Sequence, residues 1–145
     1  MKQRGFTLLE VLVAMLILSI GLVGLAGLMM TGSKNNQSAY HRSQASWMAY
    51  DILDRMRANR PLAQSGGYDL GLGATPTATG TALTDITQWT TQVANALPEG
   101  KGAIARSNGI TEITVSWNDS RGLGVLKIGG FVGNAAQSVM LRTKL

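Results

Sequence analysis

The chain has 145 residues, a formal net charge of +5 at pH 7 and 45% hydrophobic residues. This length has room for one small domain beside a long helix, and no more. The absence of cysteine excludes a disulfide framework and a thiolate metal site, although an exported protein can do without both.

The N-terminus combines a short basic leader with a long apolar run. Lys2 and Arg4 lie in residues 1–5, and residues 6–30 contain a single charged side chain, Glu10. At about 1.5 Å per residue, a helix over residues 6–30 would be roughly 37 Å long, enough to cross a hydrocarbon core of about 30 Å. The segment therefore predicts a transmembrane helix, and the leader cations predict a cytoplasmic N-terminus.

Two other kinds of protein also begin with a basic leader and an apolar run. A cleaved secretory signal has an apolar region of roughly 7 to 15 residues, shorter than this one, and Glu10 lies where such a region should begin. No clean A-x-A cleavage site follows the run. The other alternative is an ordinary membrane anchor that is never cut.

Glu10 is the most informative residue of the apolar run. A carboxylate in the middle of a spanning helix costs about 2.5 to 3.5 kcal/mol on insertion scales, so an acid there indicates a function. The competing interpretation is that Glu10 lies near the cytoplasmic surface and stays hydrated, helped by Lys2 and Arg4.

The residues Gly5-Phe6-Thr7-Leu8-Leu9-Glu10 resemble the processing site of type IV prepilins and type II secretion pseudopilins. The resemblance implies cleavage between Gly5 and Phe6 by a prepilin peptidase, N-methylation of Phe6, and pairing of Glu10 with the N-terminal amine of a neighbouring subunit. Other implied partners are major and minor pilins and an inner-membrane assembly platform. The precursor would be a single-pass inner-membrane protein with a periplasmic head, later found in a pilus at the cell surface.

Glycines recur within the apolar run, at Gly21, Gly24 and Gly27. Small residues let membrane helices approach closely, while each glycine weakens a helix by about 1 kcal/mol relative to alanine. We expect close packing against neighbouring subunits, with the helix able to melt between Ser19 and Gly27 on assembly.

Residues 31–60 predict an amphipathic continuation of the same helix, ending near Asn59 or Arg60 because Pro61 disfavours a helical residue before it. Its large apolar side chains predict a core face for the head rather than a partner-binding stripe; they are Trp47, Met48, Ile52, Leu53 and Met56.

The head should occupy residues 61–145. Its glycine- and threonine-rich start predicts a loop over residues 61–83. A short helix is expected over residues 84–97, with Asp85 and Gln88 as a capping box. Residues 102–145 then predict a small antiparallel sheet of three to four strands, at 102–106, 110–117, 125–131 and 138–143. The whole predicts an α+β, pilin-like fold. The C-terminal part also resembles minor pilins of the PilV type, more loosely than the N-terminus resembles prepilins.

Catalytic chemistry is poorly supported. The single histidine, His41, is expected on solvated helix surface, and Asp119 is expected to be a turn residue rather than a cation ligand. We therefore predict no enzyme activity, no metal and no cofactor. Arg55, Arg57 and Arg60 could contact DNA phosphates, but cations at a helix C-terminus are equally expected from the helix dipole.

These observations together predict a minor type IV pilin. A type II secretion pseudopilin is the alternative, and a DNA-uptake pilin is the weaker one. Nucleic acid is not an expected partner.

Overall fold

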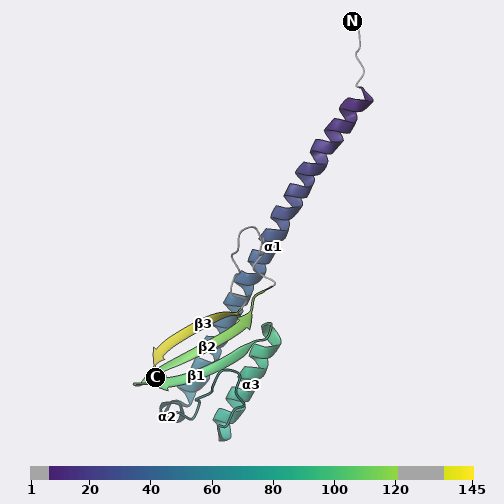
Figure 1. Cartoon of the computed structure of the whole chain (residues 1–145). Coiled ribbons are helices and arrows are strands. Elements are labelled where there is room, and N and C mark those ends of the chain that lie inside the picture. Colours follow the sequence, from purple (N-terminus) through teal and green to yellow (C-terminus); the bar gives the residue numbers. More distant parts are fainter. Residues whose placement is uncertain (1–6, 121–135) are drawn as a thin grey trace.

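The structure, a computed structural model, describes residues 7–120 and 136–145. Its elements, in chain order, are α1 (Leu8–Ala58), α2 (Arg60–Gln64), α3 (Gly80–Ala96), β1 (Lys101–Ser107), β2 (Ile110–Asn118) and β3 (Ala136–Lys144). The N-terminal half of α1 extends away from a small head, in which α3 and the strands pack around its C-terminal half (Figure 1). This confirms the predicted α+β arrangement of one long helix on a small antiparallel sheet.

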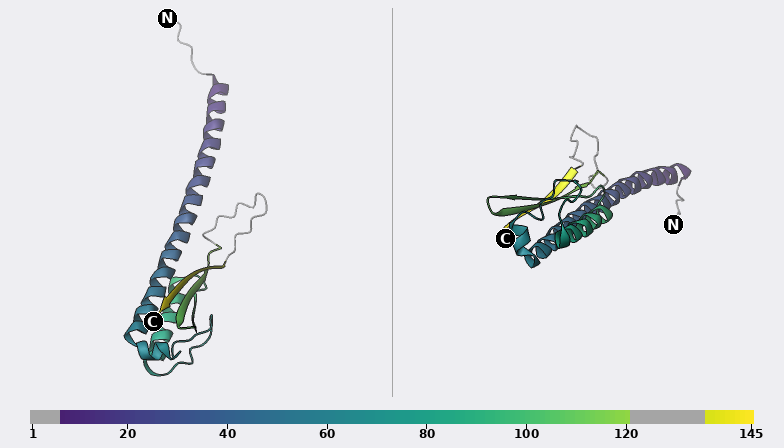
Figure 2. Two further views of the ribbon diagram at one scale, coloured as in Figure 1. Left: turned by 90° about the vertical axis from the view of Figure 1, so that its left-hand side faces the viewer. Right: turned by 90° about the horizontal axis from the view of Figure 1, so that it is seen from below.

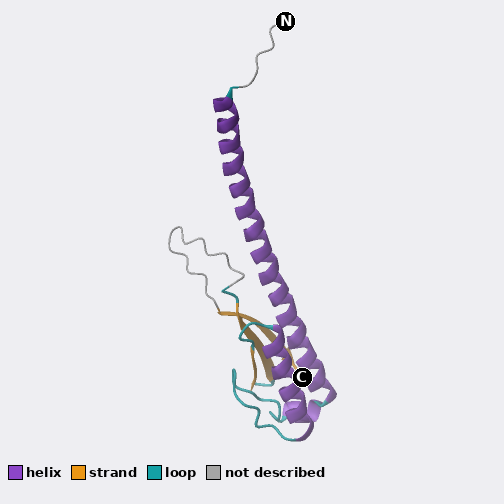
Figure 3. Ribbon diagram, turned by 90° about the vertical axis from the view of Figure 1, so that its right-hand side faces the viewer, coloured by secondary structure: helices purple, strands orange, loops and turns teal. Residues whose placement is uncertain are grey.

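α1 is a single helix of 51 residues, about 76 Å long at 1.5 Å per residue, and it runs without a break from its exposed end into the head (Figure 3). It ends at Ala58, and Asn59 is its C-cap, with a backbone N–H that donates to the Arg55 carbonyl. Pro61 then stands in the first turn of α2, where its missing N–H costs nothing. The chain thus resumes a helix directly after the stop.

The prediction of a loop over residues 61–83 is wrong at both ends, since α2 occupies the start and α3 begins at Gly80. α3 also starts four residues before the predicted position 84, with Thr79 as its extended N-cap residue. Asp85 is therefore inside the helix and forms no capping box. Its carboxylate is held by tertiary contacts instead, which no local pattern encodes.

The described strands form a sheet in the order β1-β2-β3, with both neighbouring pairs antiparallel. A tight turn joins β1 to β2, and Asn108 and Gly109 both have positive φ there, 52° and 74°. This is the backbone that an Asn-Gly hairpin favours. Leu70 covers the outer edge of β1 by exchanging two backbone hydrogen bonds with Ile104, of 2.8 and 2.9 Å. The candidate strand at 125–131 lies outside the described residues.

The core lies between two layers, one formed by the sheet and the other by α1 and α3 (Figure 2). β2 alternates strictly, so that every second side chain is buried against the helices. The fully or almost fully buried side chains of the core come from α1, α3 and β2. They are Ile52, Leu53 and Met56 of α1, Ile86, Trp89 and Val93 of α3, and Ile113, Val115 and Trp117 of β2. The predicted core face of α1 is correct except at Trp47, which is 79% exposed.

A buried tyrosine joins the helices to the loop that follows α2. The Tyr68 hydroxyl donates a 2.7 Å hydrogen bond to Asp85 Oδ2 and accepts one of 3.4 Å from Asn59. Arg55 reaches the same group, at 3.6 Å from Asp85 and 3.1 Å from Asp51. Burial, with the Asp85 hydrogen bond as a further cause, raises the pKa of Tyr68 above 10.0.

This shift predicts a loss of stability in alkali. Because the pKa of Tyr68 is higher in the folded chain, the folded state keeps a proton that the unfolded state has lost, so stability falls as the pH rises above about 10. Tyr68→Phe should unfold about 1 kcal/mol more easily at neutral pH and should lose less further stability in alkali than the wild type.

Urea unfolding of the full chain in lipid nanodiscs, followed by tryptophan fluorescence at several pH values, measures both effects. Tyr50→Phe is the matched control because Tyr50 is 54% exposed. An equal alkaline slope in wild type and Tyr68→Phe would contradict the prediction.

Gly102 provides a second test of the core. A Cβ atom at this position would overlap the six-membered ring of Trp89, which is fully buried. Gly102→Ala should therefore destabilise the head by about 1 to 3 kcal/mol, the usual cost of overpacking. Gly71→Ala is the control, because its Cβ would meet only Ala74 Cβ, at an ordinary 3.5 Å. If the two variants unfold at the same urea concentration, the close packing of α3 on β1 is wrong.

Candidate functional site

The first described residue, Thr7, is the N-cap of α1. Its backbone is extended, with φ −79° and ψ 148°, and its hydroxyl accepts a 3.3 Å hydrogen bond from the Glu10 backbone N–H. This satisfies one of the free donors at the start of the helix. Gly5 and Phe6, the predicted cleavage residues, lie outside the described residues, directly before this cap.

Glu10 lies in the first turn of α1 and is exposed. A negative charge is favourable there, since the free N–H groups of a helix start carry partial positive charge. The ion pairs found in the part of the chain that the structure describes do not include Glu10. In the single chain its carboxylate is thus free to meet a cation from elsewhere.

The apolar half of α1 is exposed on all sides. It contains a stretch long and apolar enough to cross a membrane, and none of that stretch is buried within the chain. The hydroxyls of Ser19 and Thr31 donate to the carbonyls of Met15 and Gly27, at 2.7 and 3.0 Å, so neither needs water. This surface is suited to lipid or to other helices.

The glycines of this half leave open space. A Cβ at Gly21, Gly24 or Gly27 would meet no atom within 4 Å, so the backbone is accessible to a neighbour there. The helix is intact through these residues in the single chain. Melting on assembly concerns a different state and stays a prediction.

The helix enters the head at Ser38, the first buried residue of α1. The Ser38 hydroxyl donates a 2.5 Å hydrogen bond to Oδ2 of Asp119, which is 1% exposed. One turn on, Arg42 donates to Gln137 at 3.3 Å. The two bonds tie the end of β2 and the start of β3 to the helix. The prediction that Asp119 is simply a turn residue missed this role, because its partner lies 81 positions away.

His41 is half-buried, with an edge-to-face contact to Tyr40 at 5.9 Å between ring centroids. Its Nδ1 atom is buried and has no hydrogen-bond partner. The prediction that His41 lies on solvated helix surface is therefore only partly correct. Within residues 7–120 and 136–145, no three His, Cys, Asp or Glu side chains gather as a metal site would require.

Two of the three arginines at the end of α1 are engaged in ion pairs. Arg55 contacts Asp51 and Asp85, and Arg57 contacts Asp54 at 2.9 Å. Their charge is largely balanced by these neighbours, which weakens the case for a phosphate-binding surface.

The comparison with protein families gives one match, to the prokaryotic N-terminal methylation motif, over residues 1–26. Searches of curated proteins and of solved structures each found no match to the chain.

The motif and the long apolar helix support a prepilin-type protein, in the broad class of type IV pilin-like proteins and pseudopilins. The motif implies processing by a prepilin peptidase and assembly with other pilins in a membrane machinery, and the helix indicates membrane anchoring. This is a structural class and not a known enzyme family. The match ends at residue 26 and does not extend to the head.

Proposed function

We propose that the chain is a minor type IV pilin, of the PilV type, that is incorporated into a pilus or primes its assembly for adhesion or twitching motility. The observation that carries the proposal is the methylation motif at residues 1–26, joined without a break to an exposed apolar helix that continues into the head. Soluble monomers rarely expose an apolar surface of this size, so the surface indicates contact with a membrane or with other helices.

In this proposal residues 1–5 are a leader removed between Gly5 and Phe6, and the new amino group of Phe6 is methylated. Residues 6–30 then serve first as a single membrane span and later as filament core. The N-terminus faces the cytoplasm and the head, residues 61–145, faces the periplasm before the subunit enters the pilus. The peptidase, the other pilins and an inner-membrane assembly platform are the partners.

Glu10 is proposed to pair with the N-terminal amine of a neighbouring subunit. Cleavage creates a cation four residues before Glu10, and both charges lose water when helices bundle. Pairing them between chains offsets the desolvation of each, whereas a subunit that lacks one partner leaves a buried charge behind, at about 3 to 5 kcal/mol. The pair thereby also fixes the axial register of adjacent helices.

A type II secretion pseudopilin is the alternative, because the same N-terminal motif is expected there. Copurification with sheared pili supports the pilus assignment, and association with a secretion filament instead supports the alternative. DNA uptake is the weaker candidate.

The first prediction concerns processing. The membrane-bound protein, analysed by N-terminal sequencing and mass spectrometry, should begin at residue 6 and carry one added methyl group on Phe6. A large side chain at the cleavage position should block this, so Gly5→Arg should retain Met1. A wild-type protein that begins at Met1 would contradict the pilin proposal and favour a membrane anchor that is never cut.

The second prediction concerns assembly. Glu10→Gln keeps the size of the side chain but removes its charge, so the precursor should still be inserted and processed while its amount in sheared filaments falls strongly. Ser19→Ala, in the same apolar segment, is the control and should assemble normally. Normal processing together with normal assembly of Glu10→Gln would show that the intersubunit role is wrong.

A further inference from the structure

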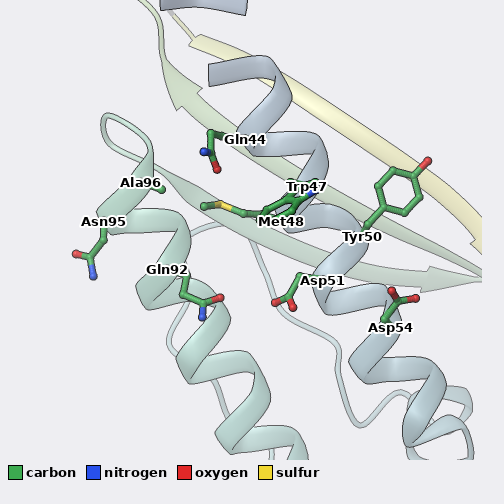
Figure 4. Close-up of a pocket in the computed structure, with 9 residues that line it drawn as sticks. All are labelled: Gln44, Trp47, Met48, Tyr50, Asp51, Asp54, Gln92, Asn95 and Ala96. Carbon is green, nitrogen blue, oxygen red and sulfur yellow. The ribbon is translucent and has the colours of Figure 1, made fainter. Parts of the chain in front are cut away.

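A shallow groove of about 660 Å³ runs between α1 and α3 on the surface of the head. Gln44, Trp47 and Asp51 line it from α1, and Gln92 and Ala96 line it from α3. Figure 4 shows the carboxylate of Asp51 and the amide of Gln92 projecting toward each other from the two walls. The volume lies within the range of sites for small ligands.

Trp47 is the feature that needs explaining. The chain has three tryptophans, and Trp89 and Trp117 are 0% and 2% exposed, whereas Trp47 is 79% exposed. Leaving a large aromatic surface in water costs free energy that an interaction partner can recover. The indole therefore offers a flat apolar platform at the groove.

Two hydrogen bonds fix the spacing of the helices that form the walls of the groove. Trp89 Nε1 donates a 2.9 Å hydrogen bond to the Met48 carbonyl, and Arg55 donates one of 3.0 Å to Gln88. Both bonds join α1 to α3, so the two walls keep their spacing without a ligand. A preorganised site loses less conformational entropy on binding.

The polar groups around the platform favour an uncharged ligand. Gln92 presents an amide, which both donates and accepts hydrogen bonds. Each carboxylate of the groove has a guanidinium beside it, because Asp51 pairs with Arg55 at 3.1 Å and Asp54 pairs with Arg57 at 2.9 Å. Arg55 also lies 3.6 Å from Asp85, so one carboxylate is in excess, but Asp85 does not line the groove and accepts a hydrogen bond from Tyr68. Hydroxyl groups would find both donors and acceptors in the groove.

We propose that this groove binds a neutral oligosaccharide. The apolar face of a sugar ring stacks on the indole of Trp47, which matches it in width and flatness. Hydroxyl groups of the same ring bond to the side chains of Gln92 and Asp51. A second aromatic residue, Tyr40, lies seven positions before Trp47, about 10.5 Å along the helix, and it shares Gln44 with the groove through a 2.9 Å hydrogen bond. A linear ligand can extend in that direction.

The test uses the full chain in lipid nanodiscs, because detergents with sugar head groups would compete. Chitotriose is the probe, and acrylamide quenching of tryptophan fluorescence is the measurement. Since the other two tryptophans are buried, quenching reports mainly on Trp47. Chitotriose should protect it at millimolar concentration.

Binding itself is measured by ligand-observed NMR, which does not depend on the fluorophore. Trp47→Ala should weaken binding about tenfold, Trp47→Phe should restore most of it, and Gln92→Ala should weaken it severalfold. Met140→Ala, at an exposed position on β3, is the control and should bind as the wild type does.

Three results would overturn the proposal. The first is no binding of chitotriose or maltotriose at millimolar concentration. The second is equal or tighter binding of the cationic glucosamine trimer, which would show that the groove selects charge. The third is protection of Trp47 that rises with protein concentration and without sugar, which would show that a second copy of the chain covers the groove.

Discussion

The whole molecule depends on one helix that must satisfy two environments. The N-terminal half of α1 has no buried residue before Ser38, and the C-terminal half supplies Ile52, Leu53 and Met56 to the core of the head. A head of about 85 residues has a marginal core by itself. The same helix therefore completes the head at one end and offers an uncovered apolar surface at the other.

The contact between α1 and the rest of the head is polar where the helix enters the head and apolar further along the helix. Ser38 and Asp119 meet where the helix enters the head, and the buried side chains of α1 follow toward Asn59. A buried carboxylate is tolerated only with a hydrogen-bond partner, so the contact specifies one alignment of helix and sheet more than it adds stability.

The sequence predicted what depends on local pattern. The apolar run, the stop before Pro61, the Asn-Gly hairpin and the alternation of β2 each have a signal within a few residues, and the α+β fold follows from them. What it missed depends on contacts between distant segments. Asp85 looked like a helix cap but is held by Tyr68 and Arg55, and the exposure of Trp47 could not be separated from the burial of Ile52 by periodicity. The N-terminal motif can be identified from the sequence, whereas the groove beside α3 can be located only once the fold is known.

The Leu70 bridge has a consequence for copies that crowd together. A bare edge strand invites a strand from another molecule, and small sheets aggregate by this route. Leu70 occupies that edge of β1 through its two hydrogen bonds to Ile104, and Gly73 adds a third, to the Gly102 carbonyl at 3.4 Å. This edge of β1 is therefore closed to strand addition at Gly102 and Ile104, whereas β3 forms the opposite edge of the described sheet.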